Sequence, residues 1–247
     1  MANNGIPNVP MLGVLGGMGP LASAQFMLRL TLLTPAARDQ DHIPAVLWSD
    51  PRIPDRMAAK YGTGPSPLPW LLRGISGLER AGCGIVVIPC NTAHGWYEEM
   101  RAASPLPIPH IVDAVAADLT RQGILPAPSG ITIGVMGTAA TLRMRLYQDR
   151  LETLGYRCIT PDDAEMDRCV SPAIALVKAN RVPESYDPAM AAAKNLMDRG
   201  AAAVVLGCTE LPLAVQAGPA ANFPMADSID ALARTAIAWA RPETAAV

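Results

Sequence analysis

Two cysteines occupy equivalent positions in two similar stretches of the sequence. Cys90 follows the apolar run 85–88, and Cys208 follows the apolar run 203–206. Each run has the length and the Val, Ile and Leu content of a buried strand, and small polar residues that suit the first turn of a helix follow each cysteine. We therefore expect the two thiols at the carboxyl ends of two similar strands.

Two thiols that face each other across a substrate can invert a stereocentre next to a carboxylate. One base removes the proton from one face of the carbon while an acid delivers a proton to the other face, and two identical groups do this in both directions. A thiol acts as the base only when it is ionised; its ordinary pKa is about 8.5, and a helix N-terminus lowers it. Because a helix start is expected after both Cys90 and Cys208, we expect each thiolate to be stabilised in this way.

The elements that would position the two cysteines recur along the chain. Gly13 precedes Cys90 by 77 residues and Gly134 precedes Cys208 by 74, and both intervals read strand, glycine turn, helix, strand, helix, strand, cysteine. Alternating strands and helices form parallel sheets, which bind ligands beyond the carboxyl ends of their strands. We therefore predict an α/β protein of two pseudo-symmetric parallel-sheet domains related by internal duplication, with the active site in the interdomain cleft.

A segment rich in proline and glycine, residues 123–130, marks the best domain boundary in the chain. We predict a first α/β domain over residues 1–115, joined by a C-terminal helix over residues 225–247, and a second α/β domain over residues 116–224. Strands are predicted over residues 11–15, 45–48, 85–88, 131–136 and 203–206, and helices over residues 21–33, 71–81, 93–103 and 113–122.

The first predicted strand runs into a glycine turn that matches a dinucleotide-binding fingerprint in part. Gly17, Gly19 and Ala22 satisfy the GxGxxA form, and Asp41 lies at about the expected distance. Asp41 nevertheless precedes the next predicted strand, 45–48, whereas the ribose-binding acid should lie beyond that strand. We therefore expect no cofactor, and favour a turn whose backbone N–H groups bind an anion.

Two regions could supply cations for an acidic substrate. The stretch 49–69 holds five prolines and two glycines together with Arg52, Arg56 and Lys60, and a loop of this length is typically a lid or a binding loop. Its cations would receive a substrate carboxylate, or else lie in solvent as ordinary surface charge. Lys178 interrupts the otherwise apolar stretch SPAIALVKAN, where an ammonium group must reach solvent, form a pair or contact a ligand.

Composition limits the remaining classes of function. With 20 basic against 22 acidic residues in 247, the chain has no charge excess that favours nucleic acid. No apolar run approaches the roughly 18 residues of a membrane helix, and the start MANNGIPNVP lacks the features of a signal peptide, so we expect a cytoplasmic protein without membrane contact. Five cysteines with no CxxC pair favour neither disulfides nor a metal site. The thiols expected to be idle are Cys83, Cys158 and Cys169.

Four motifs carry a resemblance to a known family. In chain order, GVLGGMGPLAS, SDPRIPDR, IPCNTAH and LGCTELPL resemble the aspartate/glutamate racemase family, and most closely its aspartate racemases, over residues 11–234. The resemblance implies a cofactor-independent amino-acid racemase, with neither PLP nor a metal, that consists of two pseudo-symmetric α/β domains and usually forms a homodimer. It also implies one catalytic cysteine from each domain, and the matching positions are Cys90 and Cys208.

The same resemblance implies the residues that bind the amino-acid substrate. Arg56 and Lys178 match the ligands of a side-chain carboxylate, which suits a dicarboxylic amino acid because a second carboxylate needs its own partner. Glu210 is expected either to cap its helix or to bind the substrate's amino group. The positions that match ligands of the α-carboxylate and the amino group are Met18, Gly19, Asn91, Thr92 and Thr209.

These residues predict the interconversion of L- and D-aspartate by proton transfer between two thiols. Glutamate or a broad range of amino acids is the alternative substrate. A related dicarboxylic-acid isomerase or decarboxylase is an alternative enzyme, although decarboxylation needs only one cysteine. A two-lobed protein that binds a small anion without chemistry is the alternative outside enzymes. A cysteine hydrolase would use His94, four residues after Cys90, as its base; a structural role at the helix start explains His94 equally well.

Overall fold

The strands of the protein form two parallel sheets, which confirms the predicted α/β fold class. The computed structural model describes residues 11–127 and 130–242. The first sheet has the strand order β2-β1-β3 and contains β1 (Met11–Gly16), β2 (Ala45–Ser49) and β3 (Cys83–Val87). The second sheet has the order β5-β4-β6-β7 and contains β4 (Ile131–Gly137), β5 (Tyr156–Ile159), β6 (Ala203–Gly207) and β7 (Met225–Asp227).

The helices follow the predicted order, with differences at their ends. The expected helix 93–103 is divided into a 3-10 turn and an α-helix, and the expected helix 113–122 begins earlier because the His110 side chain accepts the Val112 N–H and caps it. In the first half the elements are α1 (Pro20–Leu33), η1 (Asp39–Asp41), α2 (Arg56–Lys60), α3 (Leu68–Arg80), η2 (Thr92–Trp96), α4 (Tyr97–Ala103) and α5 (Ile111–Arg121). In the second half they are α6 (Ala139–Arg143), α7 (Leu146–Thr153), α8 (Asp163–Glu165), η3 (Met166–Val170), α9 (Ser171–Lys178), η4 (Val182–Ser185), α10 (Tyr186–Asp198), α11 (Leu211–Val215) and α12 (Ser228–Ala240).

The two sheets repeat one arrangement. β1 lies between β2 and β3 as β4 lies between β5 and β6. Beside β3, the Val86 N–H donates to the Pro107 carbonyl oxygen at 3.0 Å; beside β6, the Val204 N–H donates to the Pro224 carbonyl oxygen, also at 3.0 Å. In the second sheet the residues after Pro224 go on to pair with β6 as the strand β7. In the first sheet the described residues after Pro107 form no strand beside β3. The repeat counted in the sequence is therefore a repeat of sheet topology.

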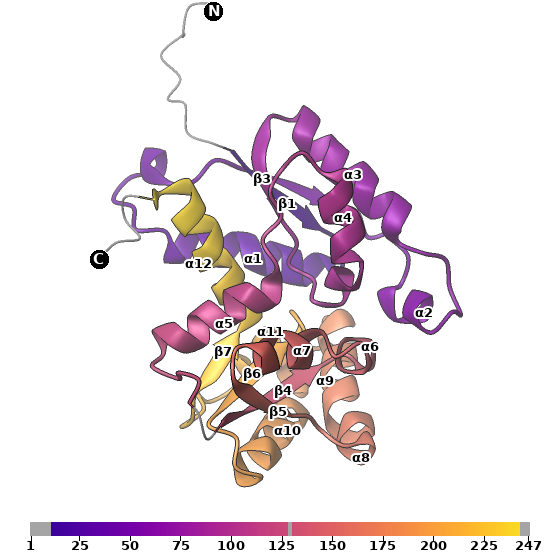
Figure 1. The fold of residues 1–247 in the computed structure, drawn as a ribbon, viewed down its shortest axis with the longest axis vertical. Coiled ribbons are helices and arrows are strands. Elements are labelled where there is room, and N and C mark those ends of the chain that lie inside the picture. The colour runs from indigo at the N-terminus through magenta and orange to yellow at the C-terminus, as the bar shows by residue number, and fades with distance from the viewer. Residues whose placement is uncertain (1–10, 128–129, 243–247) are drawn as a thin grey trace, which may run out of the picture.

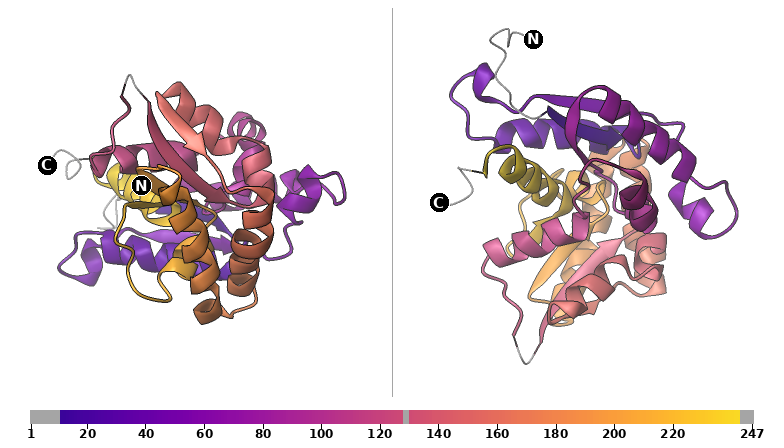
Figure 2. Two further views of the ribbon diagram at one scale, coloured as in Figure 1. Left: turned by 90° about the horizontal axis from the view of Figure 1, so that it is seen from below. Right: turned by 45° about the horizontal axis from the view of Figure 1, so that its top comes forward.

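Helices α5 and α12 lie between the two sheets (Figures 1 and 2). α12, the last helix among the described residues, packs against α1 and β1 of the first half, and α5 packs against α7 and β7 of the second half. The core between the sheets takes buried side chains from both halves, among them Val14, Val87, Val135, Val205 and Leu232. Each half thus contributes a helix to the packing of the other, and the two sheets share one core.

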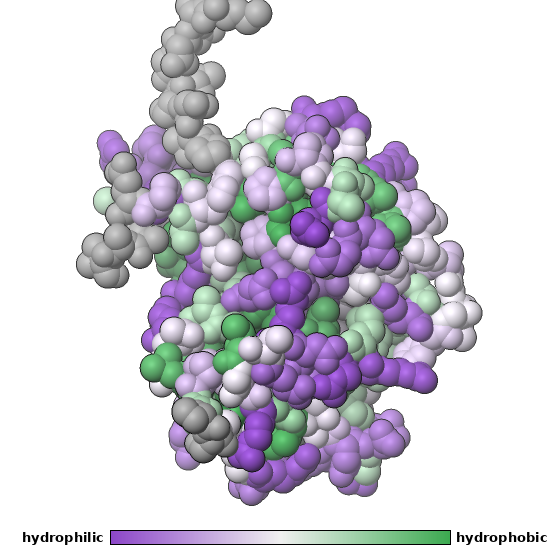
Figure 3. All heavy atoms as spheres, in the orientation of Figure 1, coloured by the Kyte–Doolittle hydropathy of each residue, from purple (hydrophilic) through white to green (hydrophobic). Residues whose placement is uncertain are grey.

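The outer faces of both sheets are covered by helices as well. α3 lies over all three strands of the first sheet, and its buried Leu71, Ile75 and Leu78 recur at helical spacing. All five residues of β6 are buried, as expected for a parallel strand with both faces covered. On the surface seen in Figure 3, hydrophilic and hydrophobic side chains are interspersed.

The predicted domain ranges stay a prediction. The boundary expected at residue 115 falls within α5. The helix expected over residues 225–247 starts only at Ser228 as α12, because residues 225–227 form the strand β7. Parts of these ranges lie outside the described residues: 1–10 at the start, 128–129 in the segment rich in proline and glycine, and 243–247 at the end.

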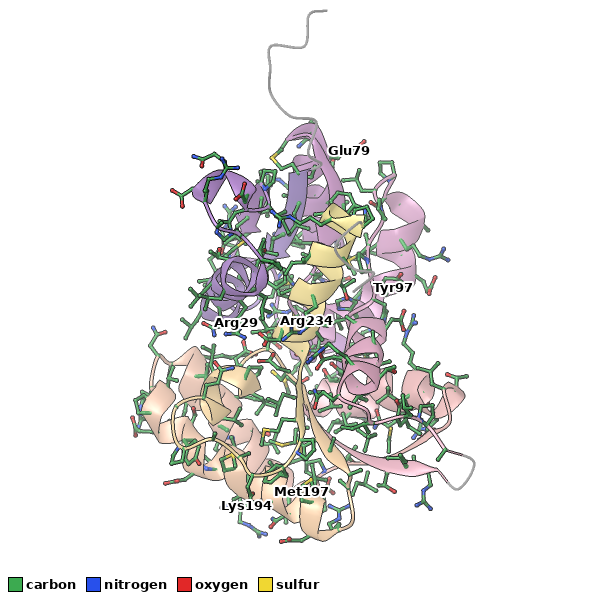
Figure 4. All side chains as sticks on the ribbon, turned by 90° about the vertical axis from the view of Figure 1, so that its left-hand side faces the viewer. Arg29, Glu79, Tyr97, Lys194, Met197 and Arg234 are labelled. Atoms are coloured by element: carbon green, nitrogen blue, oxygen red, sulfur yellow. The ribbon has the colours of Figure 1, made fainter. Side chains whose placement is uncertain are left out.

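An ion pair joins α1 to α12. Arg29 Nε and Nη2 donate to the two carboxylate oxygens of Asp230 at 2.6 and 2.7 Å, close to Arg234 where the two halves meet (Figure 4). We predict that Arg29→Met lowers the free energy of unfolding by about 1.5–3 kcal/mol, the range of hydrogen bonds to charged groups. Arg101→Met, which removes the exposed pair with Glu98, is expected to lower it by less than about 1 kcal/mol. Urea unfolding followed by circular dichroism measures both, and equal losses would contradict the prediction.

Candidate active site

Cys90 and Cys208 line the same cavity. Cys90 lies three residues beyond the end of β3 and Cys208 lies directly beyond the end of β6. Both residues are buried, each with 5% of its surface exposed. The cavity has a volume of about 20 Å³, close to the space that one water molecule needs. An amino acid can therefore bind between the thiols only after the walls have moved apart.

The structure brings the residues predicted from the sequence together. Gly19 lines a wider adjoining cavity of about 450 Å³, which shares Asp55, Arg56, Lys178 and Glu210 with the thiol cavity. The other nine predicted residues line the thiol cavity itself: Met18, Arg56, Cys90, Asn91, Thr92, Lys178, Cys208, Thr209 and Glu210. The two cavities thus meet at two cations and two carboxylates, of which Asp55 is exposed and Glu210 is buried.

Arg56 is the cation of the expected binding loop that lies in the site. It is the first residue of α2, which Asp55 caps by accepting the Ala58 N–H at 2.8 Å. Its Nη1 donates to two backbone carbonyl oxygens of the loop, at 2.9 and 3.1 Å, and its buried Nε has no hydrogen-bond partner. The other two loop cations bind elsewhere: Arg52 pairs with Asp50, and Lys60 donates to the Gly95 carbonyl oxygen at 2.7 Å. The guanidinium is thus held in place by Nη1, while its Nε–H remains available to a ligand.

Lys178 lies at the rim of both cavities. It is the last residue of α9 and is exposed. Asn180, two residues on, has a φ of 59°, a left-handed conformation that asparagine tolerates better than most residues, and it ends the helix. Within residues 11–127 and 130–242, Lys178 forms no ion pair, so its ammonium group is available to an anion that enters.

Asn91 is held by residues from the second half of the chain. Tyr147 Oη donates to Asn91 Oδ1 at 2.6 Å, and Asn91 Nδ2 donates to Ser228 Oγ at 3.2 Å. Ser228 Oγ in turn donates to the Leu206 carbonyl oxygen at 2.8 Å. Both polar atoms of the Asn91 side chain are therefore engaged in positioning the turn that carries Cys90. Neither Tyr147 nor Ser228 stands out in the sequence, because each is far from Asn91 along the chain.

A triangle of threonines joins the two halves beside the thiols. The hydroxyl oxygens of Thr92, Thr138 and Thr141 lie 3.0 Å from one another, and all three residues are buried. Thr138 also lines the thiol cavity and caps α6 by accepting the Thr141 N–H. Sequence reasoning missed Thr138, although it directly follows β4 as Gly17 directly follows β1, and the repeat could have identified it.

The glycine turn after β1 is a tight backbone crossing. Gly17 has a φ of 91°, and a Cβ at this position would lie 2.5 Å from the backbone of Asp50. The Gly17 N–H donates to Ser23 Oγ at 2.9 Å, and Ser23 Oγ donates to the Gly19 carbonyl oxygen at 2.8 Å. Asp41 pairs with Arg38 on the surface. The turn thus brings Met18 and Gly19 to the site, while the Gly17 N–H expected to bind an anion is already engaged.

Comparisons with known proteins assign the chain to a family. The family profile described as Asp/Glu/Hydantoin racemase matches residues 15–236. The chain belongs to this family. It is 26% identical to a broad specificity amino-acid racemase, RacX, of Bacillus subtilis over 92% of this chain and 96% of that protein. It is 29% identical to a glutamate racemase of Deinococcus radiodurans, over 89% of this chain and 69% of that one. The solved structure of an aspartate racemase of Picrophilus torridus superposes with a TM-score of 0.81 at 30% identity, over 94% of both chains.

Membership of this family makes the protein an isomerase, with an amino acid as the fitting substrate class. Among residues 11–127 and 130–242, no helix is long and apolar enough to cross a lipid bilayer. The same residues contain no cluster of three or more His, Cys, Asp or Glu side chains placed to hold a metal ion. Cys83, Cys158 and Cys169 are free thiols that line neither the thiol cavity nor the adjoining one.

The two site thiols of this racemase are hard to ionise in the free state. Burial raises the pKa of Cys90, against the lowering effect of the Arg56 charge and the Ala93 N–H. Burial also raises the pKa of Cys208 well above its ordinary value, and the Glu210 carboxylate, 2.9 Å from its Sγ, raises it further. Backbone N–H groups at the two helix starts do lower these pKa values, as expected. The loss of water outweighs them, so that the pKa of each thiol is raised.

His94 supports the backbone of Cys90 and does not contact its thiol. His94 Nδ1 lies 3.0 Å from the Cys90 carbonyl oxygen. Its ring packs edge-on against His110 at 4.9 Å, and burial lowers the pKa of His94 to about 4. A neutral imidazole bonded to a carbonyl oxygen is a structural element. This geometry speaks against the cysteine hydrolase that would use His94 as its base.

We predict that kcat/KM for racemisation rises between about pH 7 and pH 9, by about tenfold per pH unit below the thiol pKa. Only an ionised thiol removes a proton, and the raised pKa keeps both thiols neutral near pH 7. Initial rates followed by chiral chromatography measure this dependence. A kcat/KM that stays constant over the range would contradict it.

Proposed function

We propose that the protein is a cofactor-independent aspartate racemase in which Cys90 and Cys208 exchange protons with opposite faces of Cα. The observation that carries this proposal is the shared cavity: two buried thiols, from equivalent strand ends of a duplicated fold, line the same space. The thiolate of one cysteine takes the Cα proton and the thiol of the other delivers a proton to the opposite face. The two thiols supply both proton transfers, so the proposal needs no cofactor.

The two cations at the junction of the two cavities favour a dicarboxylic substrate. Arg56 and Lys178 are proposed to bind the side-chain carboxylate, since Arg56 Nε is buried without a partner and Lys178 is exposed at the rim. Glu210 Oε1 is also buried without a hydrogen-bond partner, and we propose that it accepts a hydrogen bond from the substrate's ammonium group. Arg56 and Lys178 then pair with the side-chain carboxylate of aspartate and Glu210 with its ammonium group, while Asp55, the other carboxylate at the junction, caps α2.

A longer or more varied side chain is the second candidate. The adjoining cavity of about 450 Å³ has apolar walls at Leu21, Ile53 and Val177, which gives room for a side chain beyond the two cations. This space favours glutamate or a broad range of amino acids as the alternative substrate. Chiral analysis of the products from a panel of L-amino acids decides between the two.

We also propose that the protein is a cytoplasmic homodimer. α1 exposes Leu21, Leu28 and Leu32, whose exposed fractions are 37%, 52% and 63%. They are seven and four residues apart, which places them on one side of the helix as an apolar stripe. Such a stripe is suited to contact a second copy of the chain. A molar mass equal to one chain, measured by light scattering, would argue against the dimer.

We predict that Cys90→Ala and Cys208→Ala each lower the racemisation rate of aspartate by about 10²–10⁴-fold, the usual contribution of a positioned acid or base. Cys169→Ala, which removes a thiol outside the site, is the matched control and is expected to keep the wild-type rate. Chiral chromatography of the product from L-aspartate measures all three. Full activity in either site variant would rule out the two-thiol mechanism.

The charge match leads to a separate prediction. Removing one cation that pairs with the side-chain carboxylate should raise KM for aspartate by about 10- to 100-fold, the value of a hydrogen bond to a charged group. Arg56→Met and Lys178→Met test this, with Arg52→Met and Lys194→Met as matched controls outside both cavities. An unchanged KM in both site variants would show that another group binds that carboxylate.

A further inference from the structure

The residues two positions beyond the cysteines differ between the two halves. Thr92 follows Cys90 and Glu210 follows Cys208 at the same interval. The Cys208 thiol donates to Glu210 Oε2 at 2.9 Å, whereas the Thr92 hydroxyl contacts two threonine hydroxyls of the second half at 3.0 Å. The two cysteines are equally buried, at 5% exposed. A site that is pseudo-symmetric in its strands and thiols is therefore asymmetric in its charges.

The groups around Cys208 favour its neutral form. Burial raises its pKa, and the charge and the hydrogen bond of Glu210 raise it further; the Lys178 ammonium, at the end of α9, opposes them. Glu210 is itself only 3% exposed, so its charge is poorly screened by water. The other titratable group facing this thiol is Tyr147 from α7, and burial raises the Tyr147 pKa, so the phenol stays neutral.

The groups around Cys90 are more favourable to a thiolate. Burial raises the pKa of this thiol too, and the Glu210 charge adds to it, but Arg56 from α2 and Lys178 from α9 both lower it. No carboxylate within the described residues accepts a hydrogen bond from the Cys90 thiol. His94 contacts the backbone of Cys90 and is neutral, because burial lowers its pKa to about 4.

We propose that Glu210 makes the two thiols unequal: it holds Cys208 as the proton donor of the free enzyme and leaves Cys90 as the base. This assignment rests on the proposed two-thiol racemisation. The Cys90 thiolate takes the Cα proton and becomes a thiol, while the electron pair of the broken C–H bond stays on the substrate. Cys208 then gives its proton to that electron pair on the opposite face and becomes a thiolate.

The same contact explains how the enzyme returns to its starting state. After the reaction Cys208 is a thiolate beside the Glu210 carboxylate, and two adjacent anions disfavour each other. Cys208 therefore takes a proton from solvent, and Cys90 loses its proton to solvent. Glu210 acts here as a positioning residue, since it sets the proton on Cys208 and does not itself remove the Cα proton.

The test is the pH dependence of alkylation of each thiol without substrate. The wild-type protein is treated with iodoacetamide over a range of pH, and mass spectrometry of the two cysteine peptides reports a pKa for each thiol. We expect a lower pKa for Cys90 than for Cys208. Glu210→Gln keeps the shape of the side chain and removes its charge. At fixed pH it should raise the alkylation rate of Cys208 by about tenfold or more, and that of Cys90 by less. Glu79→Gln, at the end of α3 and away from the site (Figure 4), is the charge-matched control.

A Cys208 pKa equal to or below that of Cys90 in the wild type would overturn the proposal, and this comparison needs no variant to fold. An unchanged Cys208 pKa in folded Glu210→Gln would overturn the role of Glu210. Because the thiols are titrated without substrate, the result stands apart from the proposed activity. Unequal thiols in a protein that does not racemise aspartate would contradict the proposed function and leave the inequality in place.

Discussion

The site depends on the burial of two thiols where two parallel sheets present the carboxyl ends of their strands. Parallel strands bring such ends to one edge of a sheet, and the repeated topology supplies a second edge, so that Cys90 after β3 and Cys208 after β6 line one cavity. Burial raises the pKa of both thiols, so that nearby positive charge is needed to favour either thiolate. The same exclusion of water strengthens the effect of each charged side chain at the site.

Contacts between the halves decide how closely the two edges approach. Neutral hydrogen bonds act next to the thiols, in the threonine triangle and in the bond from Tyr147 to Asn91. An ion pair between Arg29 and Asp230 joins α1 of the first half to α12, the helix of the second half that packs against it. Because the thiol cavity holds only about 20 Å³, these contacts hold the halves in a closed arrangement. An amino acid needs more space between the thiols than this cavity offers, so the cavity walls must move apart for it to bind.

Much of this arrangement could be predicted from the sequence, and the remainder has physical reasons. The strand ends, the repeat and the residues around each cysteine are local patterns, so the parallel sheets and the meeting of Cys90 with Cys208 followed from them. The place of Arg56 and Lys178 in the site followed from the resemblance to the racemase family. Tyr147 reaches Asn91 only through the fold, and no local pattern marks it. The lowering of the thiol pKa by the helix starts was predicted because a helix start is visible in the sequence. The larger, opposing effect of burial was not, because the 5% exposure of each cysteine is decided by the fold.

The most direct test of the account is the fate of the Cα proton in the first turnovers. L-Aspartate is incubated with the enzyme in D2O. At low conversion the two enantiomers are separated, and mass spectrometry measures the deuterium content of each. Two thiols on opposite faces predict that the D-aspartate formed carries deuterium at Cα while the remaining L-aspartate does not, because the removed proton and the delivered deuteron belong to different groups. Equal deuterium in both enantiomers would mean that one base serves both faces, and would contradict the account.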